Sequence, residues 1–130
     1  MTNEELKRKF IVDESTLAKD LENVVEKALE FCVVDNAGRV HLKKHGFPAK
    51  VSIKLALTAR RIASQLDSNF TPELSIEEIS TATGLPGNQV RARLNEVVAE
   101  RFAEVSGRGV YKANAFRIPA FLDELKGEQL

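Results

Sequence analysis

Apolar residues along this chain recur at two different spacings, and the first regular stretch lies near the N-terminus. Five apolar residues follow one another in steps of 4, 3, 4 and 3, namely Leu17, Leu21, Val24, Ala28 and Phe31. Such steps place side chains on one face of an α-helix, which Asp13 or Ser15 can cap. A shorter helix is expected before it, from about Asn3 to Phe10, because Thr2 and Glu5 have the spacing of a capping box.

The spacing then changes to that of short strands. Residues 31–34 and 39–42 are apolar runs on either side of Asp35-Asn36-Ala37-Gly38, which predicts a β-hairpin. After a connector from Lys43 to Pro48, helical spacing returns from about Ala49 to Leu66. The inward stripe of this helix is predicted to be Val51, Leu55, Ala59, Ile62 and Leu66, with Ile53 and Leu57 on a second side.

The second half of the chain reads as a loop, two helices, a hairpin and a last helix. Residues 67–74 are expected to be a loop, after which Ser75-Ile76-Glu77-Glu78 is a capping box for a short helix ending at Thr83. Gly84 suits a left-handed C-terminus, and Leu85-Pro86-Gly87 a tight turn. We expect a helix at 88–100, a hairpin at 102–113 around Gly107-Arg108, and a helix after Ile118. The inward residues of the 88–100 helix are Val90, Leu94, Val97 and Val98.

This order of elements points to a known module. Helix, short helix, tight turn, helix and hairpin between Ala49 and Ala113 is the order of a winged helix-turn-helix. With its Leu85-Pro86-x-Asn88-x-Val90-Arg91 sequence, the stretch 74–114 resembles winged-helix transcription regulators, particularly small archaeal ones. The resemblance covers about half of the chain, and residues 2–48 resemble no family that we recognise. The alternative is a plain three-helix bundle followed by an unrelated hairpin.

We therefore predict a mainly α protein of the α+β class. A winged helix-turn-helix domain would occupy residues 48–117. Residues 1–47 would form an N-terminal extension of helix and β-hairpin, and residues 118–130 a short C-terminal helix and tail. The stripe in the extension fits either a two-stranded coiled coil in a homodimer or packing on the chain's own core beside the last helix. Its two heptads do not decide between them.

The helix at 88–100 carries the candidate DNA-binding residues. At about 100° per residue, its outer face opposite Val90 and Leu94 bears amides, a small residue and flanking cations. Asn and Gln amides can pair with adenine, and Arg side chains reach phosphates, so this face suits the major groove. Glu96 on the same face suits it less. The residues concerned are Asn88, Gln89, Arg91, Ala92, Arg93 and Asn95.

The second hairpin adds two candidate contacts. The resemblance implies that Arg108, at a glycine-rich tip, lies along the DNA backbone or in the minor groove, where the potential is negative. Lys112 on the returning strand can touch phosphate. For all eight candidate residues on the helix and the hairpin, an ordinary solvent-exposed surface without a partner is the alternative.

The net charge of the chain limits the kind of nucleic-acid binding that can be expected. The 19 basic and 19 acidic residues cancel, which excludes a polybasic nonspecific binder. Residues 48–120 nevertheless hold ten basic and seven acidic residues, a net charge of +3. So small an excess neutralises few phosphates, and a homodimer would raise the affinity.

Other classes of function find little support. Cys32, His41 and His45 lack an obvious fourth ligand for structural zinc, and no phosphate-binding loop or catalytic triad pattern is present, so we expect no metal, no cofactor and no enzyme. One cysteine, no signal peptide and no membrane-length apolar run favour the cytoplasm.

Two functions therefore stand from the sequence. The first is a sequence-specific, homodimeric regulator of transcription that binds double-stranded DNA, with a recognition helix at about 88–100 and a wing at about 102–113. The second is a winged-helix module that binds a protein partner in a transcription, replication or chromosome-maintenance assembly. Zero net charge and Glu96 favour the second.

Overall fold

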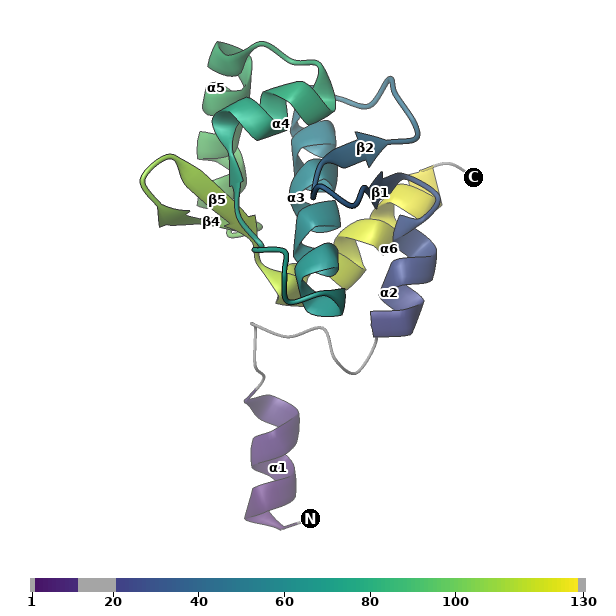
Figure 1. Cartoon of the computed structure of the whole chain (residues 1–130). Helices are drawn as coiled ribbons and strands as arrows, with labels where there is room; N and C mark the ends of the chain where they lie inside the picture. Colours follow the sequence, from purple (N-terminus) through teal and green to yellow (C-terminus); the bar gives the residue numbers. More distant parts are fainter. Residues whose placement is uncertain (1, 12–20, 129–130) are drawn as a thin grey trace.

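Helix α3 (Ala49–Leu66) runs through the middle of the fold (Figure 1). The computed structural model describes residues 2–11 and 21–128, and the fold is of the mixed α+β class. The N-terminal part contains α1 (Asn3–Phe10), α2 (Leu21–Ala28), β1 (Cys32–Val34) and β2 (Val40–Leu42). After α3 come β3 (Leu74–Ser75), α4 (Ile76–Thr83), α5 (Gly87–Ala99), β4 (Ala103–Gly107), β5 (Val110–Ala113), the 3₁₀ turn η1 (Ala115–Arg117) and α6 (Ile118–Glu128).

The central helix is buried on more sides than one stripe allows. The predicted bounds of α3 are confirmed, and so is its second side, since Ile53 and Leu57 are fully buried. The predicted inward stripe is wrong at both ends, because Val51 is only half-buried and Leu66 is 60% exposed. The reason is that α2, both sheets, α4 and α5 pack against α3 from different directions. Its buried residues are Ile53, Leu55, Ala56, Leu57, Thr58, Ala59, Arg61, Ile62 and Ala63.

A strand that the sequence did not predict joins the second hairpin. The end of the expected loop at 67–74 is instead the first residue of β3, which pairs antiparallel with β5 through Leu74 and Tyr111. The resulting three-stranded sheet has the order β3-β5-β4. Two residues are too few to show the alternation of a strand, and the pairing partner lies far along the chain, so the local pattern carries no signal for β3.

Both predicted hairpins are present, with one shift in the second. In the first, Cys32 pairs with Leu42 and Val34 with Val40. In the second, Gly107 already belongs to β4 and pairs with Val110, so the turn is Arg108-Gly109 rather than Gly107-Arg108. Gly109 takes the left-handed conformation there with φ of 72°, which a residue with a Cβ rarely adopts.

The α4–turn–α5 segment forms largely as its end signals predict. Ser75 and Glu78 make both hydrogen bonds of the capping box, and Gly84 ends α4 in the left-handed conformation with φ of 75°. Helix α5 begins one residue earlier than predicted, at Gly87, and its inward residues Val90 and Leu94 are fully buried. Val98 is half-buried rather than inward.

The end of α5 is an unusual Schellman motif. The Phe102 N–H donates to the Val97 carbonyl at 3.1 Å, and the Arg101 N–H to the Val98 carbonyl at 2.9 Å. Arg101 occupies the left-handed position with φ of 65°, where glycine is the usual residue because a Cβ is crowded there.

We expect Arg101→Gly to raise the free energy of unfolding by about 0.5–1 kcal/mol, because glycine relieves this crowding by more than it adds to the unfolded chain's entropy. Urea denaturation followed by circular dichroism measures the change. Arg101→Ala is the matched control, since it removes the same side chain and charge but keeps the Cβ. An equal gain in both variants would contradict the backbone explanation.

The N-terminal extension shares the hydrophobic core of the rest of the chain. Val24, Ala28 and Phe31 are at most 5% exposed and belong to one buried cluster with residues of α3 to α6. Helix α2 packs beside α6, and Lys27 Nζ lies 2.6 Å from Asp123 Oδ1. The stripe could form a coiled coil in a homodimer or pack on the chain's own core, and these three side chains do the second. Leu17 and the caps Asp13 and Ser15 lie outside the described residues.

Arg60 ties the first hairpin to the loop before β3. Its guanidinium donates to the carbonyls of Gly38 and Thr71. Gly38 has φ of 86°, and a Cβ at this position would come within 2.6 Å of Arg60 Nη1. The hairpin turn therefore needs glycine both for its backbone and for this contact.

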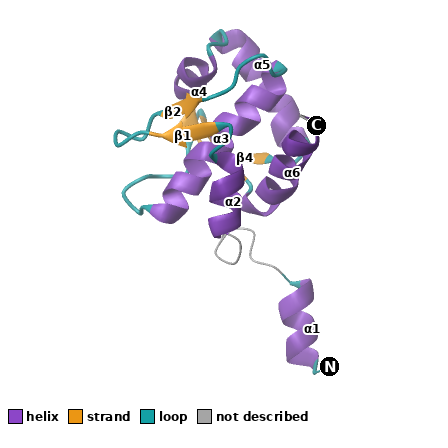
Figure 2. Ribbon diagram, turned by 90° about the vertical axis from the view of Figure 1, so that its right-hand side faces the viewer, coloured by secondary structure: helices purple, strands orange, loops and turns teal. Residues whose placement is uncertain are grey.

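Helix α1 stands apart from the body (Figures 1 and 2). Its predicted bounds are confirmed, and Thr2 caps it by accepting from the Glu5 N–H, but none of its residues is buried. Across the part of the chain that the structure describes, no helix combines the length and the apolar character needed to span a bilayer.

Candidate nucleic-acid interface

Helix α5 turns one face to the core and the opposite face to solvent. Val90, Leu94 and Val97 are fully buried against the helices and strands that α5 contacts. The outer face presents amide groups and a small side chain between them, without a large apolar residue. The exposed residues on it are Asn88, Gln89, Arg91, Ala92, Asn95 and Glu96. The predicted site residues of this helix therefore share one surface, with the exception of Arg93.

The N-terminus of α5 was not among the predicted site residues. Its N-cap is Pro86, and no side chain caps the helix. Gly87 is the first helical residue, and because the Gln89 and Val90 N–H groups donate to the Pro86 carbonyl, the N–H groups left at this end are those of Gly87 and Asn88. Such groups, at the positive end of the helix dipole, are suited to a phosphate oxygen. A proline before a glycine in place of a Ser, Thr or Asp cap is the sequence signal that could have indicated this.

Two of the predicted cations are engaged with carboxylates of their own chain. Arg93 is half-buried, and its Nε lies 3.4 Å from Glu96 Oε2 one turn along α5. Lys112 Nζ lies 3.5 Å from Glu104 Oε1 on the paired strand β4. Because both carboxylates are also exposed, these pairs contribute little net positive charge to the surface.

The other two predicted cations are exposed and not paired. Arg91 on α5 and Arg108 at the tip of the second hairpin are in no ion pair within residues 2–11 and 21–128. They come from elements on the same side of α3, since α5 contacts β4 and the β4–β5 hairpin extends beside it in Figure 1. The positive charge available to an anionic partner is therefore carried mainly by Arg91 and Arg108.

The hairpin that carries Arg108 is held to the sheet near its tip. Ser106 Oγ donates to Glu73 Oε1 at 2.9 Å, just before β3, and Ser106 is the residue left out of the strand register between Val105 and Gly107. Partial burial acts to raise the pKa of the Glu73 carboxyl, but the hydrogen bond from Ser106, together with those from the Glu73 backbone and Thr71, lowers the pKa below its ordinary value. The tip is thus positioned by β3, while Arg108 itself extends into solvent.

Ion pairs hold the C-terminal end of α5 against α3. Glu100 accepts hydrogen bonds from Lys50 and from Lys54, the latter with Nζ 3.1 Å from Oε2. The Lys50 hydrogen bond is the main cause that lowers the pKa of Glu100, and Lys54 adds to it. Lys54 also lies over the rings of Phe102 and Phe121 at 5.2 and 5.8 Å. These lysines therefore orient α5, and their charge is compensated within the fold.

The residues considered for a metal or for catalysis lie apart from this surface. Cys32 is 4% exposed, and burial raises the pKa of its thiol to about 12, so it stays protonated. His41 Nε2 lies 2.8 Å from Asp35 Oδ2 on the first hairpin. Among the described residues, no group of three or more His, Cys, Asp or Glu side chains is arranged to hold a metal ion.

The surface formed by α5 and the second hairpin combines exposed amides, a helix N-terminus and two exposed arginines that are in no ion pair among the described residues. We call this set the α5–hairpin surface, and define it by Gly87, Asn88, Gln89, Arg91, Ala92, Asn95 and Arg108. Comparison of the chain with protein families, with curated proteins and with solved structures gives no match, so its function has to be argued from this geometry.

Proposed function

We propose that residues 48–117 form a winged helix-turn-helix domain that binds double-stranded DNA in a sequence-specific manner, as part of a cytoplasmic regulator of transcription. In this proposal α5 enters the major groove and the β4–β5 hairpin is the wing. The order α3, β3, α4, α5, β4 and β5, with a three-stranded sheet, supports it.

The observation that carries the proposal is the composition of the α5–hairpin surface. Asn88, Gln89 and Asn95 offer amides that can pair with base edges, and Ala92 between them allows close approach. Arg91 and Arg108 are free to contact phosphates or the minor groove. Glu96, the one acidic residue on this face of α5, is engaged with Arg93 and is thus partly compensated.

A salt series tests the proposal. The affinity for a duplex selected from a random pool is expected to fall as salt rises, with a slope reduced by about 0.9 in Arg91→Ala and again in Arg108→Ala. Fluorescence anisotropy from about 50 to 200 mM salt measures these slopes. Asn88→Ala is expected to lower the preference for the selected sequence while leaving the slope unchanged. Failure to bind any duplex at the lowest salt would overturn the proposal.

A protein partner is the second candidate, and one observation favours it. Val105 on β4 is 58% exposed, beside Glu104 and close to the hairpin tip. An apolar side chain there cannot hydrogen-bond to a phosphate, but it can pack against a protein partner. In that case Val105→Ser would abolish capture of the partner, and the salt series would show no slope that depends on Arg91.

A further inference from the structure

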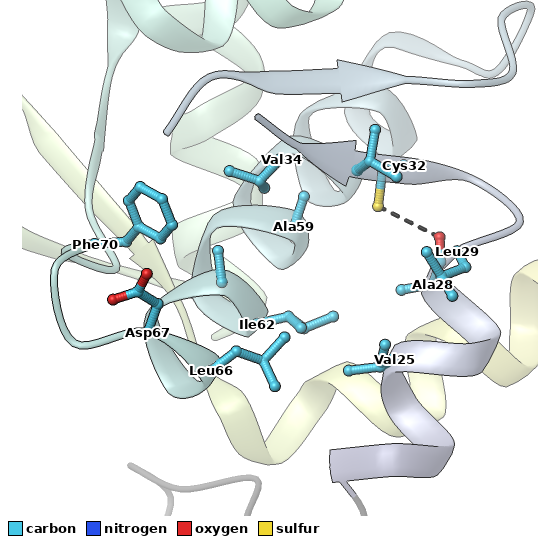
Figure 3. A pocket seen from close by; sticks show the side chains of 12 residues that line it. Val25, Ala28, Leu29, Cys32, Val34, Ala59, Ile62, Leu66, Asp67 and Phe70 are labelled. Atoms are coloured by element: carbon cyan, nitrogen blue, oxygen red, sulfur yellow. Dashed lines mark hydrogen bonds between the residues drawn. The ribbon is translucent and has the colours of Figure 1, made fainter. Parts of the chain in front are cut away.

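A hollow of about 260 Å³ lies between α2, β1 and the C-terminal half of α3 (Figure 3). Its walls are apolar and include Val25, Leu29, Val34, Ile62, Leu66 and Phe70. Leu29 and Leu66, which line it from α2 and α3, are 46% and 60% exposed, so the hollow continues into apolar surface that is open to solvent. We call this hollow the α2–α3 groove.

The second unpartnered apolar surface of the described chain is α1. Leu6 and Phe10 are four residues apart, so they lie on one face of the helix, and Ile11 follows directly. These three side chains are 48%, 91% and 64% exposed. A helix of eight residues is too short to be stable in water on its own, even with a capped N-terminus, and needs a surface to pack against.

The charges around the two surfaces are complementary. Lys7 and Lys9 lie on either side of the Leu6–Phe10 face of α1, at about 100° per residue. The groove has one charged residue in its lining, Asp67, and Glu22 lies on the same face of α2 as Val25 and Leu29. An apolar helix face with lysines at its edges thus matches an apolar groove with carboxylates at its edges.

We propose that α1 of one chain docks in the α2–α3 groove of a second copy, so that two copies exchange their N-terminal helices. Helix α1 does not occupy the groove of its own chain (Figures 1 and 2). Each copy has one such helix and one such groove, so a pair related by a twofold axis covers both of each at once. This replaces the predicted dimer contact through the α2 stripe, because the described residues of that stripe lie in the chain's own core or, for Leu21, pack against it.

The exchange of helices does not depend on DNA binding, but it would change the number of DNA-binding surfaces in one particle. A dimer of this kind would carry two α5–hairpin surfaces, and two linked contacts raise the apparent affinity through effective concentration. The oligomeric state is measured without DNA, so failure of the exchange and failure of the proposed function are separate results.

Cysteine cross-linking of the full chain tests where α1 docks. Asn3→Cys and Ser68→Cys are combined with Cys32→Ala, and the protein is oxidised and run on a non-reducing gel. Asn3 lies on the same face of α1 as Leu6 and Phe10, and Ser68 follows Asp67 at the groove, so these substitutions keep the apolar contacts. A disulfide-linked dimer at micromolar protein is the expected product. A disulfide within one chain would show docking in the same copy and would overturn the exchange, as would the absence of any cross-link. Asn3→Cys with Phe116→Cys is the control pair, since Phe116 is exposed but lies outside the groove.

Light scattering of the unmodified chain gives an independent measurement. The chain is expected to be a dimer, and Phe10→Ser is expected to weaken the dimer at least tenfold because a buried aromatic ring is lost. Phe116→Ser should leave it unchanged. Lys7→Glu is expected to weaken the dimer, and Glu22→Lys in the same chain to restore it. A chain that is monomeric at high concentration, or a dimer insensitive to Phe10→Ser, would overturn the proposal.

Discussion

Replacing Phe31 by alanine is expected to lower the free energy of unfolding by about 3–5 kcal/mol, a large part of the stability of a domain of this size. Phe31 is fully buried where α2 ends and β1 is about to begin, and its ring packs edge-on against Phe47 with 6.0 Å between centroids. Its backbone also holds the turn, since its N–H donates to Ala28 and its carbonyl accepts from Lys43.

The same variant tests whether the N-terminal extension folds together with the rest. Since Phe31 belongs to the cluster that includes Leu57, Leu94 and Leu122, we expect a single transition, shifted as a whole, in urea denaturation followed by circular dichroism. Phe116→Ala is the control, because the Phe116 side chain is 51% exposed and its loss should change stability far less. Two separate transitions, or a loss below about 1 kcal/mol, would contradict this account.

Elements with strong end signals were predicted from the sequence almost to the residue. Ser75 with Glu78 and then Gly84 mark both ends of α4, and each of these groups makes its expected local interaction. The bounds of α1 and α3 are likewise confirmed. Such signals act within three or four residues, so no knowledge of the tertiary structure is needed to read them.

Features that depend on contacts distant in sequence were missed. Strand β3 exists because β5 pairs with it, and the burial of α3 on several sides follows from what packs around it. The Lys112–Glu104 pair could not be predicted because it depends on the register of β4 and β5. The Arg93–Glu96 pair could have been predicted, since its spacing of three along a helix is a known favourable one.

The candidate site shows the same division between local and distant information. A helical wheel suffices to place Asn88, Gln89 and Arg91 on the outer face of α5, and the structure has them there. A helical wheel does not show that Glu100 compensates the charges of Lys50 and Lys54. The net charge of +3 for residues 48–120 is therefore not a measure of the charge available at the surface. The charge available to a partner is better judged from Arg91 and Arg108, which are in no ion pair among the described residues.

Reversing the charge of these two arginines together is expected to abolish DNA binding. Each phosphate contact contributes about 0.9 to the slope of log affinity against log salt, which amounts to nearly a tenfold change in affinity at about 0.1 M salt. Losing two contacts therefore costs close to 100-fold, and in Arg91→Glu with Arg108→Glu the new carboxylates also repel the backbone. We expect the affinity of the double variant to fall by more than 100-fold, with circular dichroism and thermal stability unchanged because both side chains are exposed.

A matched control separates a local contact from a general effect of net charge. Arg39→Glu with Arg117→Glu changes the net charge by the same amount at two exposed arginines outside the α5–hairpin surface, one in the first hairpin and one in η1. If α5 and the wing touch DNA, this control loses affinity only through long-range electrostatics, which salt screens beyond about 10 Å at 0.1 M. Equal losses in both double variants, measured by fluorescence anisotropy at about 100 mM salt, would place the DNA elsewhere on the protein.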